Sequence, residues 1–71
     1  GLMLAALESI SEEQREVIIM KEYEGLKFRE IAEILEVSEN TVKSRLYYGF
    51  DNLKKILTQQ GKYKEMLQDG K

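Results

Sequence analysis

Side chains able to recognise a nucleic acid are concentrated between residues 38 and 47. Hydroxyl, amide, acidic and basic groups can all bond to base edges or to phosphates. The candidates are Ser38, Glu39, Asn40, Thr41, Lys43, Ser44, Arg45 and Tyr47. The chain has no Cys and no His, which excludes disulfides, the usual general base and the usual zinc ligands. These residue types indicate binding rather than catalysis.

Pairs of carboxylates are the remaining candidates for metal binding. Glu12 with Glu13, and Glu22 with Glu24, carry suitable oxygens, but the sequence offers neither pair a converging third ligand. We therefore expect no metal site, no cofactor, no catalytic residue and no small-molecule substrate. An enzyme is the function class with the least support.

The length of 71 residues suits one small domain. Hydrophobic residues form 42% of the chain and charged residues 34%, as in a small all-helical domain. No apolar run approaches the roughly 18 residues that a membrane span needs, so we expect no membrane partner. The start at Gly1 rather than Met predicts that residues 1–71 are a fragment of a larger protein.

Residues 28–46 have the pattern of two helices joined by a tight turn. Ile31, Ala32 and Leu35 fall on one face of the first of these helices. Val37, in the turn, is expected to fill the core between them. A short turn followed by a helix with an exposed polar face predicts a helix-turn-helix. The fold class that follows is all-α, a small four-helix domain containing this motif.

The second of these helices is predicted over residues 39–60, from an N-cap at Ser38 to Gly61, with 61–71 as a tail or another turn or two of helix. Gly49 in its interior either costs roughly 1 kcal/mol relative to Ala or marks the close approach of another helix. Its buried stripe is predicted to consist of Val42, Leu46, Leu53 and Ile56.

Two further helices are predicted over residues 1–9 and 11–25. A capping box, in which Ser11 and Gln14 each bond to the other's backbone N–H, opens the second of them. Gly25 supplies a left-handed residue at its end. Its apolar residues make no single stripe, so we expect it to be covered on two sides. The apolar edge of the first helix is predicted to consist of Leu4 and Leu7.

The charge is unevenly distributed along the chain. Its total of −2 is unusual for a nucleic-acid-binding domain. Residues 1–37 carry nine acidic and four basic side chains, a net −5, and residues 38–71 carry four acidic and seven basic ones, a net +3. The basic half begins at the predicted recognition helix, which permits DNA binding without establishing it.

Four motifs occur in order: Glu-Glu-Gln-Arg-Glu-Val-Ile (12–18), Glu-Tyr-Glu-Gly-Leu (22–26), Glu-Ile-Ala-Glu-Ile-Leu (30–35) and Val-Ser-Glu-Asn-Thr-Val-Lys-Ser-Arg-Leu (37–46). At these spacings they resemble region 4 of bacterial RNA polymerase sigma factors, in particular the extracytoplasmic-function group. The resemblance covers about residues 4–57. Its most specific part is the run from Thr41 to Leu46, Thr-Val-Lys-Ser-Arg-Leu.

The resemblance implies a cytoplasmic four-helix module without catalytic activity. Such a module binds the −35 promoter element through its last helix, docks on the flap of the polymerase β subunit, and is often sequestered by an anti-sigma protein. Carried over to this chain, the helix N-terminus near phosphates and base edges would consist of Ser38, Glu39, Asn40 and Thr41. The major-groove face would be lined by Lys43, Ser44, Arg45 and Tyr47.

The chain departs from the family pattern at four places. Ser11 replaces the usual Pro, and Lys27 replaces a Ser or Thr cap, so that the helix start at Phe28 is expected to be less well fixed. Glu36 replaces a turn Gly and would be strained in a left-handed conformation. The run Tyr-Gly-Phe-Asp-Asn (48–52) replaces a basic one, which predicts low DNA affinity and a shallow salt dependence.

Several side chains in this region have two interpretations. Glu39 either compensates the helix dipole or accepts a hydrogen bond from cytosine N4. Asn40 either binds adenine through both amide atoms or is an ordinary residue of a first helical turn. Phe50, four residues after Leu46, is expected in the core, whereas the exposed aromatic ring of Tyr48 suggests a contact with protein.

An alternative function is a sigma-like protein-interaction domain that docks to polymerase or to an anti-sigma protein and has little DNA affinity of its own. The net charge of −2 and the missing basic run favour it. The output domain of a response regulator is a third alternative, and would require an upstream receiver domain.

Overall fold

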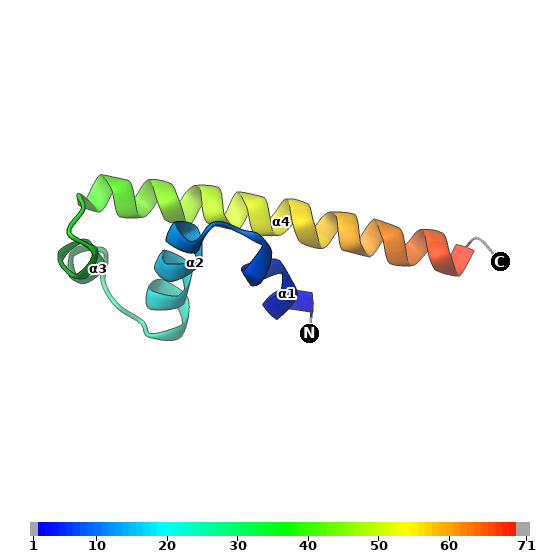
Figure 1. Cartoon of the computed structure of the whole chain (residues 1–71), viewed down its shortest axis with the longest axis horizontal. Helices are drawn as coiled ribbons and strands as arrows, with labels where there is room; N and C mark the ends of the chain where they lie inside the picture. The colour runs from blue at the N-terminus through cyan, green and yellow to red at the C-terminus, as the bar shows by residue number, and fades with distance from the viewer. Residues whose placement is uncertain (1, 70–71) are drawn as a thin grey trace.

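The computed structural model describes residues 2–69, and the side chains of residues 4–59. Its elements are α1 (Leu2–Ser9), α2 (Glu12–Ile18), the π-helical turn η1 (Ile19–Tyr23), α3 (Phe28–Leu35) and α4 (Glu39–Asp69). The long helix α4 forms a rod, and the other helices pack along its N-terminal half (Figure 1). The predicted all-α fold of four helices is confirmed, and no strand occurs in residues 2–69.

A first hydrophobic cluster joins α1 and α2 to α4. Its buried members are Ala6, Leu7, Ile10, Ile18 and Leu53, with Leu46, Ile56 and Leu57 packed against them. The predicted edge of Leu4 and Leu7 is half wrong, because Leu4 is 60% exposed. Leu4 lies about 110° round α1 from the middle of the face that carries Ala6, Leu7 and Ile10, and so points away from α4.

A second hydrophobic cluster joins α2, α3 and α4. Its buried members are Val17, Ile31, Ala32 and Val42, and Leu35, Val37 and Leu46 pack against them. The predictions that Ile31, Ala32 and Leu35 share a face and that Val37 fills the core are confirmed. Val17 and its neighbour Ile18 belong to different clusters, so α2 is covered on two sides, as expected.

The start of α2 is capped from one side only. The Ser11 hydroxyl accepts a hydrogen bond from the Gln14 backbone N–H at 3.2 Å, which confirms the N-cap. The expected return bond from the Gln14 side chain is wrong, because the Gln14 Oε1 atom accepts instead from the Asn52 amide at 3.0 Å. The amide therefore ties α2 to α4 rather than closing its own helix end.

The helix predicted over residues 11–25 changes character at Ile19. From there the chain makes a π-helical turn, in which the Glu24 N–H donates to the Ile19 carbonyl at 3.0 Å. A wider turn shifts the helical phase, which explains why no single apolar stripe is visible. Gly25 follows with φ of 71°, the left-handed conformation expected of it.

The turn regions on either side of α3 are built from unusual residues. The Lys27 side chain has no hydrogen-bond acceptor and so cannot cap the start of α3. The Glu30 carboxylate makes one of the two bonds of a capping box, because it accepts a hydrogen bond from the Lys27 backbone N–H at 2.8 Å. Glu36 is left-handed, with φ of 57° and ψ of 45°. A side chain in this conformation costs about 1 kcal/mol, so the strain expected from the sequence is present.

The beginning of α4 follows the prediction, and after Gly61 the structure selects the helix rather than the tail, the two alternatives that the sequence left open. The Ser38 hydroxyl accepts from the Thr41 N–H at 3.0 Å, which confirms the N-cap. The helix continues through Gly61 to Asp69, because a single Gly lowers helix stability by only about 1 kcal/mol. The predicted stripe is confirmed in Val42 and Leu53, which are buried, and in Leu46 and Ile56, which are partly buried and packed against the core.

Gly49 marks a close approach between α4 and α2. A Cβ atom at this position would lie 2.9 Å from Ile18 Cδ1 and 3.3 Å from Gln14 Cβ. Of the two alternatives that the sequence left open, the structure therefore selects the helix contact.

None of the helices within residues 2–69 combines the length and the apolar character needed to cross a membrane.

Candidate nucleic-acid interface

The first turns of α4 present a polar surface on the side away from the other helices. At about 100° per residue, the side chains on this outer face lie within a third of a turn of one another. They are Asn40, Ser44, Tyr47, Tyr48 and Asp51. Tyr47 is 67% exposed and Tyr48 59%, and their rings meet edge to face with centroids 5.3 Å apart. The structure thus brings three of the predicted site residues, Asn40, Ser44 and Tyr47, together.

The two predicted basic contacts do not share this face. Lys43 and Arg45 are two residues apart and so lie about 200° apart round the helix. The Lys43 ammonium is directed to α3, 5.5 Å from the centroid of the Phe28 ring. The Arg45 guanidinium is directed to α2, where its Nη2 atom lies 3.6 Å from Glu13 Oε2. The two basic side chains therefore lie on opposite edges of the outer face.

The remaining predicted residues form the first turn of α4. Ser38 and Thr41 are engaged with each other, since their hydroxyl oxygens lie 2.9 Å apart in addition to the cap bond. Glu39 and Asn40 are exposed, and neither makes a side-chain hydrogen bond or ion pair within the part of the chain that the structure describes. Their polar atoms are therefore accessible to a ligand.

A polar hollow of ≈ 340 Å³ lies between the N-terminal turns of α2 and α4. Hydroxyl, amide and charged groups line it together with one aromatic ring. The residues are Ser11, Glu13, Gln14, Asn40, Thr41, Ser44, Arg45 and Tyr48. Half of the predicted site residues thus border a single surface depression.

Lys21 is a basic residue of this region that the sequence analysis missed. Its ammonium lies 4.5 Å from the centroid of the Phe28 ring, whose other cationic neighbour is Lys43. It also donates to the Leu26 carbonyl at 3.3 Å. Lys21 lies in the acidic half of the sequence, and only the packing of α3 brings it to the edge marked by Lys43.

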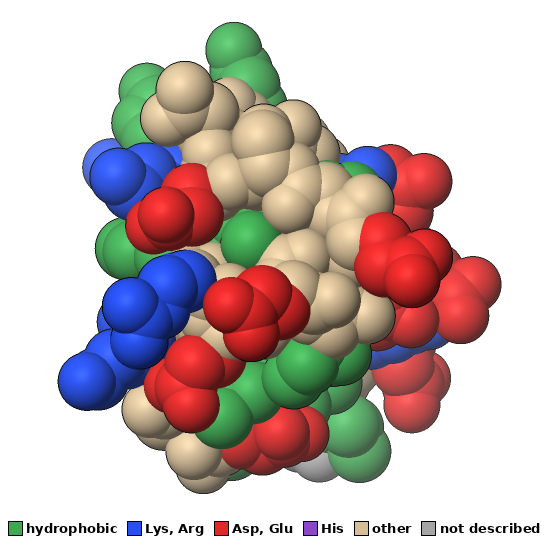
Figure 2. Space-filling view, turned by 90° about the vertical axis from the view of Figure 1, so that its left-hand side faces the viewer, with side chains coloured by type: hydrophobic (Ala, Val, Ile, Leu, Met, Phe, Trp, Pro, Cys, Tyr) green, Lys and Arg blue, Asp and Glu red, His purple; other side chains and the backbone are tan. Residues whose placement is uncertain are grey.

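Charge is unevenly distributed at this end of the molecule. Figure 2 views the end where α3 and the start of α4 meet: basic side chains lie mainly on the left, with several acidic ones beside them, and a denser group of acidic ones lies on the right. The uneven charge found along the sequence is therefore also uneven in space.

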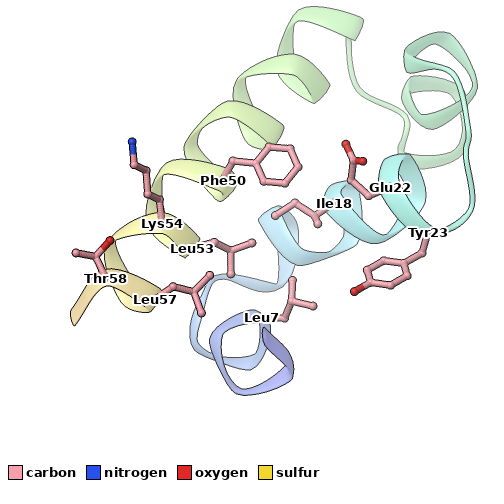
Figure 3. Close-up of a pocket in the computed structure, with 9 residues that line it drawn as sticks. All are labelled: Leu7, Ile18, Glu22, Tyr23, Phe50, Leu53, Lys54, Leu57 and Thr58. Carbon is pink, nitrogen blue, oxygen red and sulfur yellow. The ribbon is translucent and has the colours of Figure 1, made fainter. Parts of the chain in front are cut away.

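A second surface is an apolar groove of ≈ 530 Å³ bordered by α1, the end of α2, η1 and α4. Leu7, Ile18, Leu53 and Leu57 line it, and the Tyr23 and Phe50 rings border it (Figure 3). Phe50 is 41% exposed, so the expectation that it lies in the core is wrong. Its neighbours on the stripe are covered by α1 and α2, whereas Phe50 projects beside them into the uncovered groove. The charged residues of the groove are Glu22 and Lys54.

A helix-turn-helix whose second helix exposes a polar face, flanked by basic side chains, defines a protein of the DNA-binding helix-turn-helix class. Comparison with family models matches residues 1–52 to sigma-70, region 4, and the chain belongs to this family. The family is a DNA-binding regulatory domain with a role in recognising the −35 promoter element in transcription initiation, and is not known as an enzyme family. Comparison with curated proteins returned no match.

Proposed function

We propose that this chain binds promoter DNA sequence-specifically at the −35 element, as the region 4 domain of a cytoplasmic sigma factor bound to RNA polymerase. The observation that carries the proposal is the outer face of α4, which has a basic side chain on each edge. An α-helix fits the major groove, whose two walls are lined by phosphates. Lys43 and Arg45 point to opposite sides and so suit the phosphates of the two strands.

The outer face supplies the contacts to bases. Asn40, Ser44 and Tyr47 span eight residues of α4, about 10 Å along the helix axis and therefore about three base pairs. The Asn40 amide matches the N6 and N7 atoms of adenine, and the Tyr47 ring can contact a thymine methyl group. Glu39, in the first turn, can accept from cytosine N4, while Ser38 and Thr41 hold the turn together near the phosphates.

The charges predict a low affinity for the isolated domain. Lys21 and Lys43 together make one edge of the outer face positive, but Arg45 on the other edge is paired with Glu13. Asp51 adds a negative charge to the outer face, which Lys55 Nζ, 3.1 Å from Asp51 Oδ2, offsets in part. Few phosphates are neutralised, so binding weakens only gradually as salt rises. Contacts made by polymerase or by other sigma domains would supply the missing affinity.

Separate replacement of Lys43 and Arg45 by alanine tests the DNA interface. Lys43→Ala loses one phosphate contact, so we expect about five- to tenfold weaker binding to a selected duplex and a salt slope lower by about one. Arg45 is paired with Glu13, so Arg45→Ala should weaken binding less, by about two- to threefold, with a smaller change of the salt slope. Binding is measured by fluorescence anisotropy at several salt concentrations, with circular dichroism to verify folding. Lys54→Ala is the matched control, since it removes the same charge about three turns farther along α4 and leaves the ion pair of Lys55 with Asp51 in place. Unchanged binding by both folded variants would contradict the proposal.

The apolar groove favours a second role, docking to polymerase. The family implies a polymerase partner, and a groove lined by leucine, isoleucine and aromatic side chains suits an apolar segment of the β-subunit flap. Leu53 in the groove is nine residues after Ser44, about half a turn round α4 from the outer face. Flap and DNA can therefore bind at the same time. An anti-sigma protein covering either surface would block initiation.

Substitutions at two tyrosines of almost equal exposure can test polymerase docking and DNA binding separately. Tyr23 borders the groove at 68% exposure, and Tyr47 lies on the outer face at 67%. We expect Tyr23→Ala to weaken binding to the purified flap about tenfold and to leave DNA binding unchanged, because a truncated aromatic anchor costs 1–2 kcal/mol or more. Tyr47→Ala should do the reverse. If Tyr23→Ala weakens DNA binding and spares the flap, the assignment of the two surfaces is wrong.

A further inference from the structure

We infer that Glu13 limits the DNA affinity of this chain by occupying Arg45 as an internal substitute for a DNA phosphate. The inference rests on the proposed DNA-binding function and concerns its regulation by the chain itself. A carboxylate presents oxygens that match the guanidinium fork in the same way as phosphate oxygens do. Glu13 and a phosphate on the Arg45 edge therefore compete for the same donors.

The geometry places the two side chains at the mouth of the proposed interface. Arg45 Nη2 lies 3.6 Å from Glu13 Oε2, and both residues border the polar hollow next to Asn40 and Ser44. The Arg45 side chain is 26% exposed and that of Glu13 71%. A duplex whose base edges face Asn40 and Ser44 would bring a phosphate wall towards this same edge.

One cap within α2 and two contacts between α2 and α4 hold the helix turn that carries Glu13. Ser11 caps the turn that contains Glu13. The Gln14 side chain is bonded to Asn52 on α4 at 3.0 Å, and the missing side chain of Gly49 allows α2 to approach closely. Glu13 therefore lies on a helix turn that is held against α4.

The ion pair has little to contribute to folding. A separation of 3.6 Å exceeds the distance of a short charge-assisted hydrogen bond, and an ion pair with one partner in solvent is weak. Because Arg45 is bound through one nitrogen, part of its fork remains available. The pair lowers the positive charge offered to DNA without blocking Arg45 entirely, which is the behaviour expected of an affinity-limiting residue.

The test compares Glu13→Gln with Glu12→Gln in the full chain. Both variants remove one acid from the first turn of α2, but only Glu13 borders the hollow. We expect Glu13→Gln to bind a selected duplex about three- to tenfold more tightly at low salt, with a salt slope steeper by about one, because Arg45 now releases a counterion. Glu12→Gln should change the affinity less than twofold.

A double-variant cycle distinguishes competition at Arg45 from a general loss of negative charge. In an Arg45→Ala background, Glu13→Gln should change DNA affinity less than twofold. An equal gain with and without Arg45, or with Glu12→Gln, would overturn the inference. So would unchanged affinity of Glu13→Gln when the parent chain binds DNA. If neither the parent nor Glu13→Gln binds any duplex at low salt while folded, the proposed DNA-binding function fails and the inference with it.

Discussion

Replacing Gly49 with valine is expected to lower the free energy of unfolding by about 3 kcal/mol, the upper part of the range for overpacking a core. Even a single Cβ atom there would lie 2.9 Å from Ile18 Cδ1 and 3.3 Å from Gln14 Cβ. The Ile18 methyl group is the end of a flexible side chain and can move, whereas Gln14 Cβ is fixed to the α2 backbone. Valine adds two further methyl groups to this contact, so α2 must move away from α4.

Urea denaturation followed by circular dichroism measures this effect. Ser44→Val is the matched control, since it places the same β-branched side chain on the exposed outer face of α4 and should change stability by less than about 0.5 kcal/mol. Gly49→Ala should have a much smaller effect than valine, because a gain in helix propensity of about 1 kcal/mol offsets the tight contact. Equal stability of Gly49→Val and the parent chain would show that α2 and α4 are farther apart than described.

Replacing Ile31 with alanine is expected to lower the free energy of unfolding by about 3 kcal/mol. Ile31 is 0% exposed and lies at the centre of the second cluster, between Val17 on α2 and Val42 on α4. The substitution removes buried methyl groups and leaves a cavity that three helices enclose. A domain of this size has a stability of only about 4–10 kcal/mol, so a large share is lost.

Ile34 provides a control of the same residue type on the same helix. It is 57% exposed, and Ile34→Ala should cost less than about 0.5 kcal/mol. We expect the thermal midpoint of Ile31→Ala to fall by 10 °C or more, at about 4–8 °C per kcal/mol for a domain of this length. Similar midpoints for the two variants would contradict the described orientation of α3 and, with it, the helix-turn-helix.

The contacts of Lys43 and Arg45 with their neighbours account for how a chain of net charge −2 could carry the proposed DNA-binding surface. Lys43 and Lys21 cooperate on one edge of the outer face, whereas Glu13 opposes Arg45 on the other. The local arrangement of charges, rather than their total, therefore sets the expected affinity. Screening by salt acts on these few groups, which is why a salt titration is informative.

Features that depend on neighbouring residues could be predicted from the sequence. The Ser11 and Ser38 caps, the left-handed Gly25 and the shared face of Ile31 and Ala32 are each determined within one helix or turn. The same local patterns, taken in order, pointed to sigma region 4, which the family comparison shows. Strain at Glu36 also followed from its place after a helix end. Such features need no knowledge of how the helices pack.

Features that depend on packing between helices were decided only by the tertiary structure. Periodicity along α4 places Arg45 on one side of the helix, but it does not say that Glu13, 32 residues earlier in the sequence, lies opposite. The Gln14 side chain bonded to Asn52 instead of its own helix end for the same reason. Phe50 is exposed because no helix covers its side of the stripe. A helix repeat fixes directions around one axis, whereas partners and exposure depend on where the other axes lie.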